Sequence, residues 1–498
     1  MEITEEKPEG KVTQELKPTP EQEDFCQMVW SGKPCFLSAR AGTGKTSTIK
    51  LAFSRPGGLP DCTVIAFNKA NQEALSKALG PGVKVATLHS LGFAALRGFL
   101  PGLQMEPSKL FELTKQAKLK RKPKVFSDTM RLVSCAKNWG IVPARPSGQP
   151  FKAQLLPDTP ESWSALQTHF ELWEADLDAA REILQNSNEQ FWKERKVDFD
   201  DMVYLPVTLG LQVFTSSKMI VDEAQDLSPL NLKMLQKTPA KVWYVGDPYQ
   251  AIYGWRGAEE DLLENLALPE LPLTICWRCD KAIIQEAAKF VPDIKARPDA
   301  EPGLVHWMDF PPDWVKHKPG TVLGRTNAAL VGLALKLPGQ VQVLGKDFGE
   351  ILLGILQELK GNTQQALLSS LQSWYSKMSE KYPHRLGEFE DYSKALASLV
   401  VSCHGKQAVE RKIQNLFVAQ AKPGTWILST VHKAKGMEWP TVWLLDWAPK
   451  GLGQPWQEKE DRNLRYVART RAQHELFILR ESAWKDLEAR EKDWRALR

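Results

Sequence analysis

Residues 35–46, CFLSARAGTGKT, join a short apolar run to a glycine-rich turn. The apolar part predicts a buried strand over 35–39, and the text after the turn predicts a helix over 46–53. Such a loop lets backbone N–H groups approach phosphate oxygens, and the N-terminus of the following helix favours the same anion. We therefore expect a nucleotide phosphate site here, although Ala39 stands where the general pattern begins with glycine.

The side chains of this loop have separate expected tasks. Lys45 supplies positive charge to the β- and γ-phosphates, and the Thr46 hydroxyl binds Mg²⁺. The residues expected to surround the nucleotide phosphates are Ala41, Gly42, Thr43, Gly44, Lys45, Thr46 and Ser47. For the loop taken alone, a glycine-rich turn without a ligand stays open as an alternative.

A pair of acids ends a second apolar run, KMIVDEAQD over 218–226. Asp222 is placed to hold Mg²⁺ through water, and Glu223 is placed to orient or deprotonate an attacking water. Surface acids seldom end an apolar strand in this way. Together with the glycine-rich loop, and in this order, the pair favours phosphoryl transfer.

Phosphoryl transfer also needs positive charge where the transition state develops negative charge, and one arginine there contributes about 10³ to 10⁵ in rate. Candidates in polar turns are Arg256, Arg278 and Arg471. Any one of them alone is more simply explained as a surface salt-bridge residue.

The composition is that of an ordinary globular chain. Of 498 residues, 43% are apolar and 25% charged, and 65 basic against 60 acidic side chains give a net charge of +5. These values exclude a disordered chain, a collagen-like fibre and a coiled coil. The charge permits a nucleic-acid binder without identifying one, and the 18 tryptophans are more than enough to supply stacking faces as well as core.

Strand-like runs alternate with helical text in two separate parts of the chain, which predicts an α/β fold with two parallel-sheet domains, each carrying a mostly helical insertion. The expected parts are a flexible tail over 1–18, a first domain over 19–100 and 199–270, its insertion over 101–198, a second domain over 271–344 and 423–498, and a short insertion over 345–422.

The cysteines and the apolar runs bear on location. Seven scattered cysteines do not form a disulfide framework, and Cys276 and Cys279 make one CxxC with no second pair nearby, so a metal or redox role is only a minor alternative. No run approaches the roughly 20 apolar residues of a membrane helix. We expect a protein of the cytoplasm, in a bacterial nucleoid or a virus-infected host cell.

Five motifs in a fixed order carry a family resemblance: SARAGTGKTST, VDEAQDLSP, VGDPYQAIYGWRGA, STVHKAKGMEWPTVWLLD and RNLRYVARTRAQHELFIL. Together they resemble the UvrD/Rep/PcrA branch of superfamily 1 DNA helicases, and AGTGKTST, AFNKA and HKAKGMEW lean toward the F-box DNA helicase subgroup, without an F-box. The resemblance implies two RecA-like P-loop domains that hold ATP between them and move 3′→5′ on single-stranded DNA.

For the nucleotide, the resemblance implies further residues. Gln22 matches the glutamine that reads adenine, Trp277 the aromatic residue that stacks on it, and Glu438 a glutamate that contacts the ribose. Gln250 matches the sensor of the γ-phosphate. The resemblance also implies that arginines from both motors converge on the γ-phosphate, namely Arg256, Arg278 and Arg471.

For DNA, the resemblance implies contacts from Phe67, Asn68, Thr87, His89, Tyr253, Trp255, Thr430 and His432. Aromatic stacking is worth about 1–3 kcal/mol per base, comparable to the roughly 1.4 kcal/mol of one base-pair step. Core packing beside a turn is the alternative for Tyr253 and Trp255, and a structural role is the alternative for His89 and His432. The lysine-rich segment 109–124 is either a solvated helix face or a phosphate contact.

These observations predict a DNA-dependent ATPase that uses ATP and Mg²⁺, acts on single-stranded DNA and on junctions of single and double strands, and is a monomer in solution. Repair, replication and recombination are the processes expected for it. The second insertion is short for the family, which puts duplex engagement in doubt. The rivals are a translocase that displaces proteins and unwinds poorly, a P-loop switch without motor activity and, ranked lower, an RNA helicase.

Overall fold

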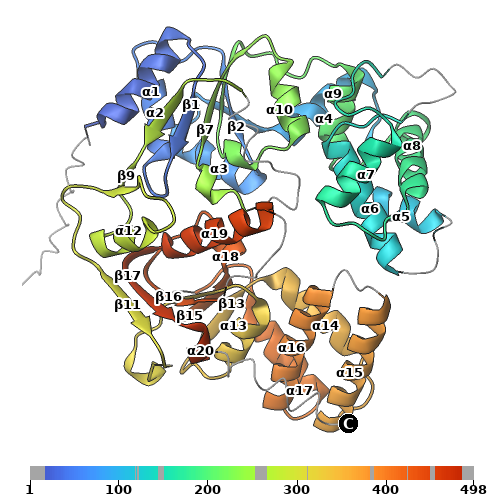
Figure 1. Cartoon of the computed structure of the whole chain (residues 1–498), viewed down its shortest axis with the longest axis vertical. Coiled ribbons are helices and arrows are strands. Elements are labelled where there is room, and N and C mark those ends of the chain that lie inside the picture. Colours follow the sequence, from blue (N-terminus) through green and yellow to red (C-terminus); the bar gives the residue numbers. More distant parts are fainter. Residues whose placement is uncertain are drawn as a thin grey trace, which may run out of the picture.

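The computed structural model describes residues 17–117, 119, 123–143, 151–252, 266–310, 312–381, 386–422, 424–448 and 455–484. Within them the chain forms two lobes, each built on one parallel sheet (Figure 1). The predicted α/β class with two parallel-sheet domains is therefore confirmed.

The sheet of the first lobe has the order β3-β2-β6-β7-β1-β8, and every pairing in it is parallel. Its strands are β1 (Phe36–Ala39), β2 (Cys62–Ala66), β3 (Lys84–Thr87), β6 (Lys218–Val221), β7 (Lys241–Gly246) and β8 (Glu270–Leu273). The central strands are buried on both faces, which explains why they read as near-continuous apolar runs.

Helices cover both faces of this sheet. On one face are α1 (Pro20–Ser31), α2 (Lys45–Phe53) and α3 (Lys69–Leu79), whose apolar side chains share a core with the sheet. The other face is covered by α4 (Leu88–Phe99), α9 (Asp201–Leu209) and α10 (Pro229–Gln236).

The first lobe extends beyond its predicted end at residue 270. Strand β8 pairs with β1 over its whole length, so the sheet continues to Leu273. Pro272 within β8 cannot donate a ladder hydrogen bond, and an edge strand is where a sheet tolerates it. The second lobe consequently begins after this strand.

The first insertion is mostly helical, with α5 (Lys109–Gln116), α6 (Pro123–Asn138), α7 (Pro160–His169) and α8 (Leu177–Glu194). At its base it also has a pair of two-residue strands, β4 (Gln104–Met105) and β5 (Lys196–Val197), too short to be seen in the sequence pattern. Its apolar side chains share one core with the second face of the sheet, so it packs directly on the first motor.

Two lysines and two aspartates lie buried where this insertion meets the lobe. Lys109 Nζ contacts Asp201 Oδ2 at 2.6 Å, and Lys137 Nζ contacts Asp198 Oδ2 and Asp201 Oδ1, each at 2.7 Å. Burial by itself would lower the pKa of Lys137, but the carboxylates of Asp198 and Asp201 outweigh it and raise that pKa. The four charges balance only as a set.

We expect Lys137→Met to lower the free energy of unfolding by about 3–5 kcal/mol, because it leaves buried carboxylates uncompensated. Urea titration followed by circular dichroism measures this loss. The control is Lys193→Met, which removes an exposed i,i+4 pair with Glu189 at 3.0 Å and should cost at most about 0.5 kcal/mol. Equal stability of the two variants would contradict the prediction.

The sheet of the second lobe has the order β11-β17-β16-β12-β15-β13-β14 and is also parallel throughout. Its strands are β11 (Leu304–Met308), β12 (Thr321–Gly324), β13 (Val341–Leu344), β14 (Phe417–Val418), β15 (Trp426–Thr430), β16 (Trp439–Leu445) and β17 (Ala472–Leu479). The helices of this lobe are α12 (Lys281–Ala287), α13 (Asn327–Ala334), α18 (Val431–Ala434), α19 (Pro455–Arg469) and α20 (Glu481–Trp484).

The second insertion consists of α14 (Lys346–Glu358), α15 (Gln364–Lys381), α16 (Leu386–Ser402) and α17 (Lys406–Leu416). It ends before β14, which returns to the sheet, so its last boundary is earlier than the predicted residue 422. Its buried residues belong to the same core as the second sheet, and in Figure 1 it lies beside that sheet. Across the described ranges, none of the helices has the length and apolar character that crossing a membrane requires.

Candidate nucleotide site

The glycine-rich loop lies between β1 and α2, as the sequence predicts. Gly42 has φ +69° and Gly44 has φ +87°, a left-handed backbone that favours glycine. A Cβ on Gly42 would lie 2.6 Å from the Cβ of Arg278, so the second lobe approaches this loop too closely for any side chain. Helix α2 then begins at Lys45, with its N-terminus at the loop.

The acidic pair follows β6 directly. Asp222 is buried, and its Oδ1 has no hydrogen-bond partner in the described part of the chain. Burial, aided by the nearby charge of Glu223, raises the pKa of Asp222 to about 7. Glu223 adopts φ +53°, a strained conformation for a residue with a side chain and one that occurs often at functional sites.

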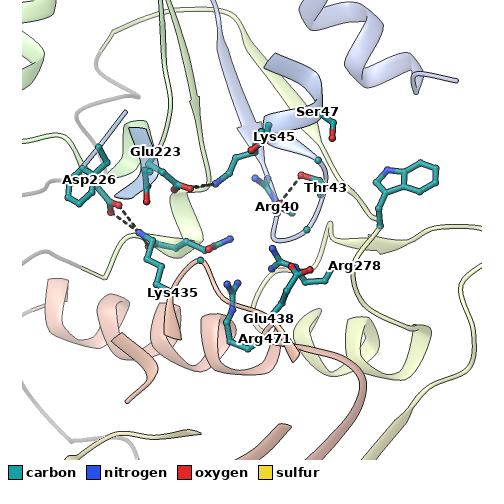
Figure 2. Close-up of a pocket in the computed structure, with 18 of the residues that line it drawn as sticks. Arg40, Thr43, Lys45, Ser47, Glu223, Asp226, Arg278, Lys435, Glu438 and Arg471 are labelled. Atoms are coloured by element: carbon teal, nitrogen blue, oxygen red, sulfur yellow. Dashed lines mark hydrogen bonds and ion pairs between the residues drawn. The ribbon is translucent and has the colours of Figure 1, made fainter. Parts of the chain in front are cut away.

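Lys45 and Glu223 pair with each other across the site. Lys45 Nζ lies 3.1 Å from Glu223 Oε1 and 3.2 Å from Oε2 (Figure 2). Burial opposes the ionised form of Glu223, but Lys45 and Lys435 outweigh it and lower the pKa of Glu223 to about 2. The carboxylate is therefore ionised and pairs with Lys45.

Gln250 is held at the end of β7 by the loop that follows the strand. Its Nε2 donates to Asp247 Oδ2 at 2.6 Å, and the Asp247 N–H donates to Gln225 Oε1 at 3.0 Å. These bonds connect Gln250 to the loop that carries the acidic pair. Gln250 lines the same cavity as Lys45.

The second lobe contributes two arginines. Arg278 contacts Glu438 and donates to Thr470 O at 3.3 Å. Arg471 is 1% exposed and donates to Met437 O at 3.1 Å and to Thr470 Oγ1 at 3.1 Å, but within the described residues it has no ion pair. Burial, followed by repulsion from Arg278, lowers the pKa of Arg471 to about 10.

A cavity of about 510 Å³ separates these groups and is lined by both lobes. Lys45 and Glu223 lie on one side of it and Arg278, Glu438 and Arg471 on the other (Figure 2). Two arginines and a lysine favour a polyanion in this space, and Arg471 has no acidic partner in the part of the chain that the structure describes. Arg278 and Arg471 therefore line the same cavity as Lys45, and their predicted roles at a phosphate stay predictions.

Two predicted nucleotide residues lie at the edge of this arrangement. Trp277 lines the cavity, and its backbone N–H donates to Gly42 O at 2.8 Å. Gln22 is next to the loop but is used structurally, because its side chain accepts from Thr19 N at 3.0 Å and donates to Thr48 Oγ1 at 3.1 Å. Its role in reading adenine stays a prediction.

The cavity also has wall residues that the sequence analysis did not single out: Arg40, Asn71, Asp226, Lys435 and Gly436. Lys435 Nζ contacts Asp226 Oδ2 at 2.7 Å and Gln250 O at 2.8 Å, so it connects the second lobe to the first. Arg40 does the same from the loop, with 2.6 Å between Arg40 Nη2 and Asp293 Oδ2. Arg40 and Lys435 both lie inside motifs that the sequence analysis quotes, and their place in those motifs is the sequence signal that could have identified them as site residues.

Comparison with known families agrees with the geometry. A model of the UvrD/REP helicase N-terminal domain matches residues 66–268, and a model of the UvrD-like helicase C-terminal domain matches residues 419–482. The first covers the acidic pair and the second covers Lys435 and Arg471.

The chain belongs to the UvrD/REP helicase family.

Two curated relatives show how far this family membership extends. F-box DNA helicase protein 1 of Schizosaccharomyces pombe is 25% identical over 520 residues, which are 90% of this chain and 55% of that protein. ATP-dependent DNA helicase Rep of Escherichia coli is 28% identical over 268 residues, 47% of this chain and 36% of that protein. The chain therefore spans about half the length, or less, of these relatives.

A solved arterivirus nonstructural protein 10, a helicase in complex with DNA, has a TM-score of 0.35 and 12% identity, covering 92% of this chain and 62% of that one.

Within this UvrD/REP chain, two predicted DNA contacts of the first lobe follow β2. Phe67 and Asn68 line the nucleotide cavity. The Asn68 side chain also caps α3 by accepting from Asn71 N at 2.9 Å. Their place on the cavity wall leaves the predicted DNA contact untested.

Thr87 ends the neighbouring strand β3, where it pairs with Ala66 at the end of β2, and His89 follows on α4. Thr87 caps α4, with its Oγ1 accepting from Ser90 N at 3.1 Å. His89 is half-buried, and burial lowers its pKa, so it is neutral at physiological pH.

In the second lobe, Thr430 ends β15 and is buried, and His432 follows on α18. The His432 Nε2 lies 3.3 Å from Arg325 Nη1 and 3.8 Å from Glu460 Oε1. A structural role for His432 thus stays open beside the predicted DNA contact. The remaining predicted residues, Tyr253, Trp255 and Arg256, lie outside the described residues.

Proposed function

We propose that this UvrD/REP family member is an ATP-dependent DNA helicase that moves 3′→5′ along single-stranded DNA and separates duplexes. The observation that carries the proposal is the cavity between the lobes, where Lys45 and Glu223 face Arg278 and Arg471. A site divided between two bodies couples nucleotide binding to their relative movement, since only closure brings all the charges to one phosphate. The motif order and the curated helicase relatives support the choice of DNA as the track.

ATP fits this site through the loop and the basic residues. We infer that the phosphates bind at the N-terminus of α2, where Lys45 exchanges Glu223 for phosphate oxygens. The released Glu223 carboxylate then orients and deprotonates water, and Gln250 contacts the γ-phosphate. Arg278 and Arg471 stabilise the negative charge that develops in the transition state.

Mg²⁺ fits two oxygen groups of the site. Asp222 Oδ1 is buried without a hydrogen-bond partner among the described residues, and the Thr46 hydroxyl is exposed at the cavity wall. Oxygen ligands of this kind are those that Mg²⁺ takes in phosphoryl-transfer enzymes. These two residues would hold the ion, which when bound supplies charge neutralisation at the β- and γ-phosphate oxygens.

DNA binds, in this proposal, along the ends of β2, β3 and β15, where Phe67, Thr87 and Thr430 lie. Its strand and its junctions with duplex are the proposed partners, and the protein acts as a monomer in the cytoplasm, in a bacterial nucleoid or an infected cell. Repair, replication and recombination are the processes in which the activity would serve.

The first test compares Lys45→Ala with Lys50→Ala, an exposed lysine on the same helix. Loss of the charge-assisted phosphate contact, worth about 1.5–3 kcal/mol, should reduce phosphate release stimulated by single-stranded DNA by roughly 10- to 150-fold. The Lys50 variant should match the unmodified protein. A Lys45 variant that keeps the stimulated rate would refute the assignment.

A second candidate is a translocase that strips proteins from DNA and unwinds poorly. It is favoured by the second insertion, which is short for the family and shares its core with the second lobe. Unwinding of tailed and forked duplexes, measured beside displacement of a bound protein, distinguishes the two. The same assay tests the other two alternatives. An RNA helicase predicts stimulation of ATP hydrolysis by RNA in place of DNA. A P-loop switch predicts nucleotide binding with no stimulation by either strand.

A further inference from the structure

Two cysteines enclose the turn that carries Trp277 and Arg278. Cys276 ends strand β9 (Ile275–Cys276), which pairs with β10 (Lys295–Ala296), and Cys279 follows three residues later. The two residues are in contact, because the backbone N–H of Cys279 donates to Cys276 Sγ at 3.4 Å. The turn between them is therefore closed by a bond from the Cys279 backbone to the Cys276 sulfur.

Each sulfur also touches a wall of the nucleotide site. A Cβ on Gly42 would lie 2.8 Å from Cys276 Sγ, so this sulfur rests on the phosphate loop. Cys279 Sγ contacts Thr470 O at 3.8 Å, and Thr470 precedes Arg471. A displacement of either sulfur would therefore move the phosphate loop at Gly42, the turn that carries Arg278, and the segment that carries Arg471.

The turn itself depends on close contacts. The Trp277 N–H donates to Gly42 O at 2.8 Å, and Arg278 contacts Glu438 and Thr470 O. A disulfide fixes the two Cβ atoms at about 3.8 Å with an S–S bond of about 2.05 Å. Only two residues separate the cysteines, so forming the disulfide must change the backbone positions of Trp277 and Arg278.

Cys276 differs chemically from the other buried thiols of the chain. Burial raises the pKa of Cys26 and of Cys35 to about 12. At Cys276 the side chain of Cys279, together with the backbone N–H groups of Cys279 and Arg278, outweighs burial and lowers the pKa to about 7. The thiolate is the nucleophilic form, so Cys276 is the more reactive of the pair.

We propose that Cys276 and Cys279 form a redox-modification site, at which a peroxide oxidant joins the two sulfurs and withdraws Arg278 and Trp277 from bound nucleotide. The Cys276 thiolate attacks the peroxide oxygen, giving a sulfenic acid and, after protonation, one water. The Cys279 sulfur then attacks the sulfenic sulfur, the S–O bond breaks, and a second water leaves as the disulfide forms. Two thiols lose two electrons, and hydrogen peroxide is reduced to two waters.

Access is controlled by the lobes. Cys276 is 0% and Cys279 2% exposed, covered by Gly42 of the first lobe and Thr470 of the second. The oxidant reaches them when the lobes separate during the ATP cycle, so this inference rests on the proposed function for its effect on activity. The disulfide then keeps the site open, since the turn no longer fits against the loop.

The experiment treats the full chain with hydrogen peroxide and measures two quantities. Peptide mass mapping detects a Cys276–Cys279 link, and phosphate release with single-stranded DNA is recorded before oxidation, after it, and after dithiothreitol. We expect the link in the unmodified protein, with a loss of stimulated turnover of about tenfold or more because one transition-state arginine is displaced. Reduction should restore the rate.

The matched control is Cys403→Ser, a partly exposed cysteine of the second insertion, which should behave as the unmodified protein. Cys276→Ser and Cys279→Ser should show neither link nor reversible loss. Absence of the link in the unmodified protein overturns the proposal even if the serine variants fold poorly, and so does a link that leaves turnover unchanged. Because the link is read by mass, a reduced protein without DNA-stimulated hydrolysis refutes the proposed function separately.

Discussion

Replacing Arg471 with alanine is expected to reduce DNA-stimulated ATP hydrolysis by about 10³-fold or more, with a much smaller change in KM. Arg471 is buried, and within the described ranges it contacts backbone carbonyls and Thr470 but no carboxylate. A buried guanidinium without an anion is costly, and burial already lowers its pKa to about 10. The γ-phosphate would supply the missing charge most fully in the transition state, so turnover should suffer more than binding.

Stopped-flow phosphate release at saturating ATP and DNA measures this loss. Arg471→Lys should recover only part of it, because an ammonium lacks the planar fork of the guanidinium. Arg480→Ala is the control, since Arg480 directly follows β17 in the same lobe and pairs with Asp309 at the surface, 2.9 Å away. Turnover within tenfold of the unmodified rate would remove Arg471 from the transition state, provided that thermal melting shows a folded variant.

Several strands of the first sheet could be predicted because parallel strands have a simple signature. Strands β1, β6 and β7 are buried on both faces, so each is a short apolar run, and each ends in a polar loop at the same edge of the sheet. Lys45, Asp222 and Gln250 follow these three strands, so sequence order alone brought them to one edge.

The contacts between the lobes could not be predicted in the same way. Lys435 and Asp226 are 209 residues apart, and Arg40 and Asp293 are 253 apart. No periodicity connects such pairs, and a lysine or an arginine in a polar loop is usually solvated. Their partners become visible only when the two sheets are placed against each other.

Side chains with two candidate roles show another limit. The motif around Thr87 predicts a DNA contact, whereas the structure uses its hydroxyl to cap α4. Asn68 likewise caps α3, and Gln22 takes part in the capping box of α1. Short polar residues at the ends of parallel strands are the ones that both helix caps and ligands require, so pattern alone does not separate the roles.

Glu223→Gln is the second change with a large expected effect, a fall in stimulated turnover of about 10²- to 10⁴-fold. The amide keeps the shape of the side chain but cannot accept a proton from water. Glu223 is ionised, because Lys45 and Lys435 lower its pKa to about 2. Phosphate release in single-turnover conditions measures the loss, with the exposed Glu73→Gln as the control.

The same substitution should leave ATP binding intact or strengthen it, and this separates a catalytic role from a structural one. In the unmodified protein an incoming phosphate must displace Glu223 from Lys45, which lies 3.1 Å away. In the variant the competing carboxylate is replaced by a neutral amide, so ATP displaces it from Lys45 at a lower free-energy cost. Fluorescent-nucleotide titration should therefore give a Kd no higher than that of the unmodified protein. A Kd that rises while turnover is retained would mean that Glu223 only positions Lys45.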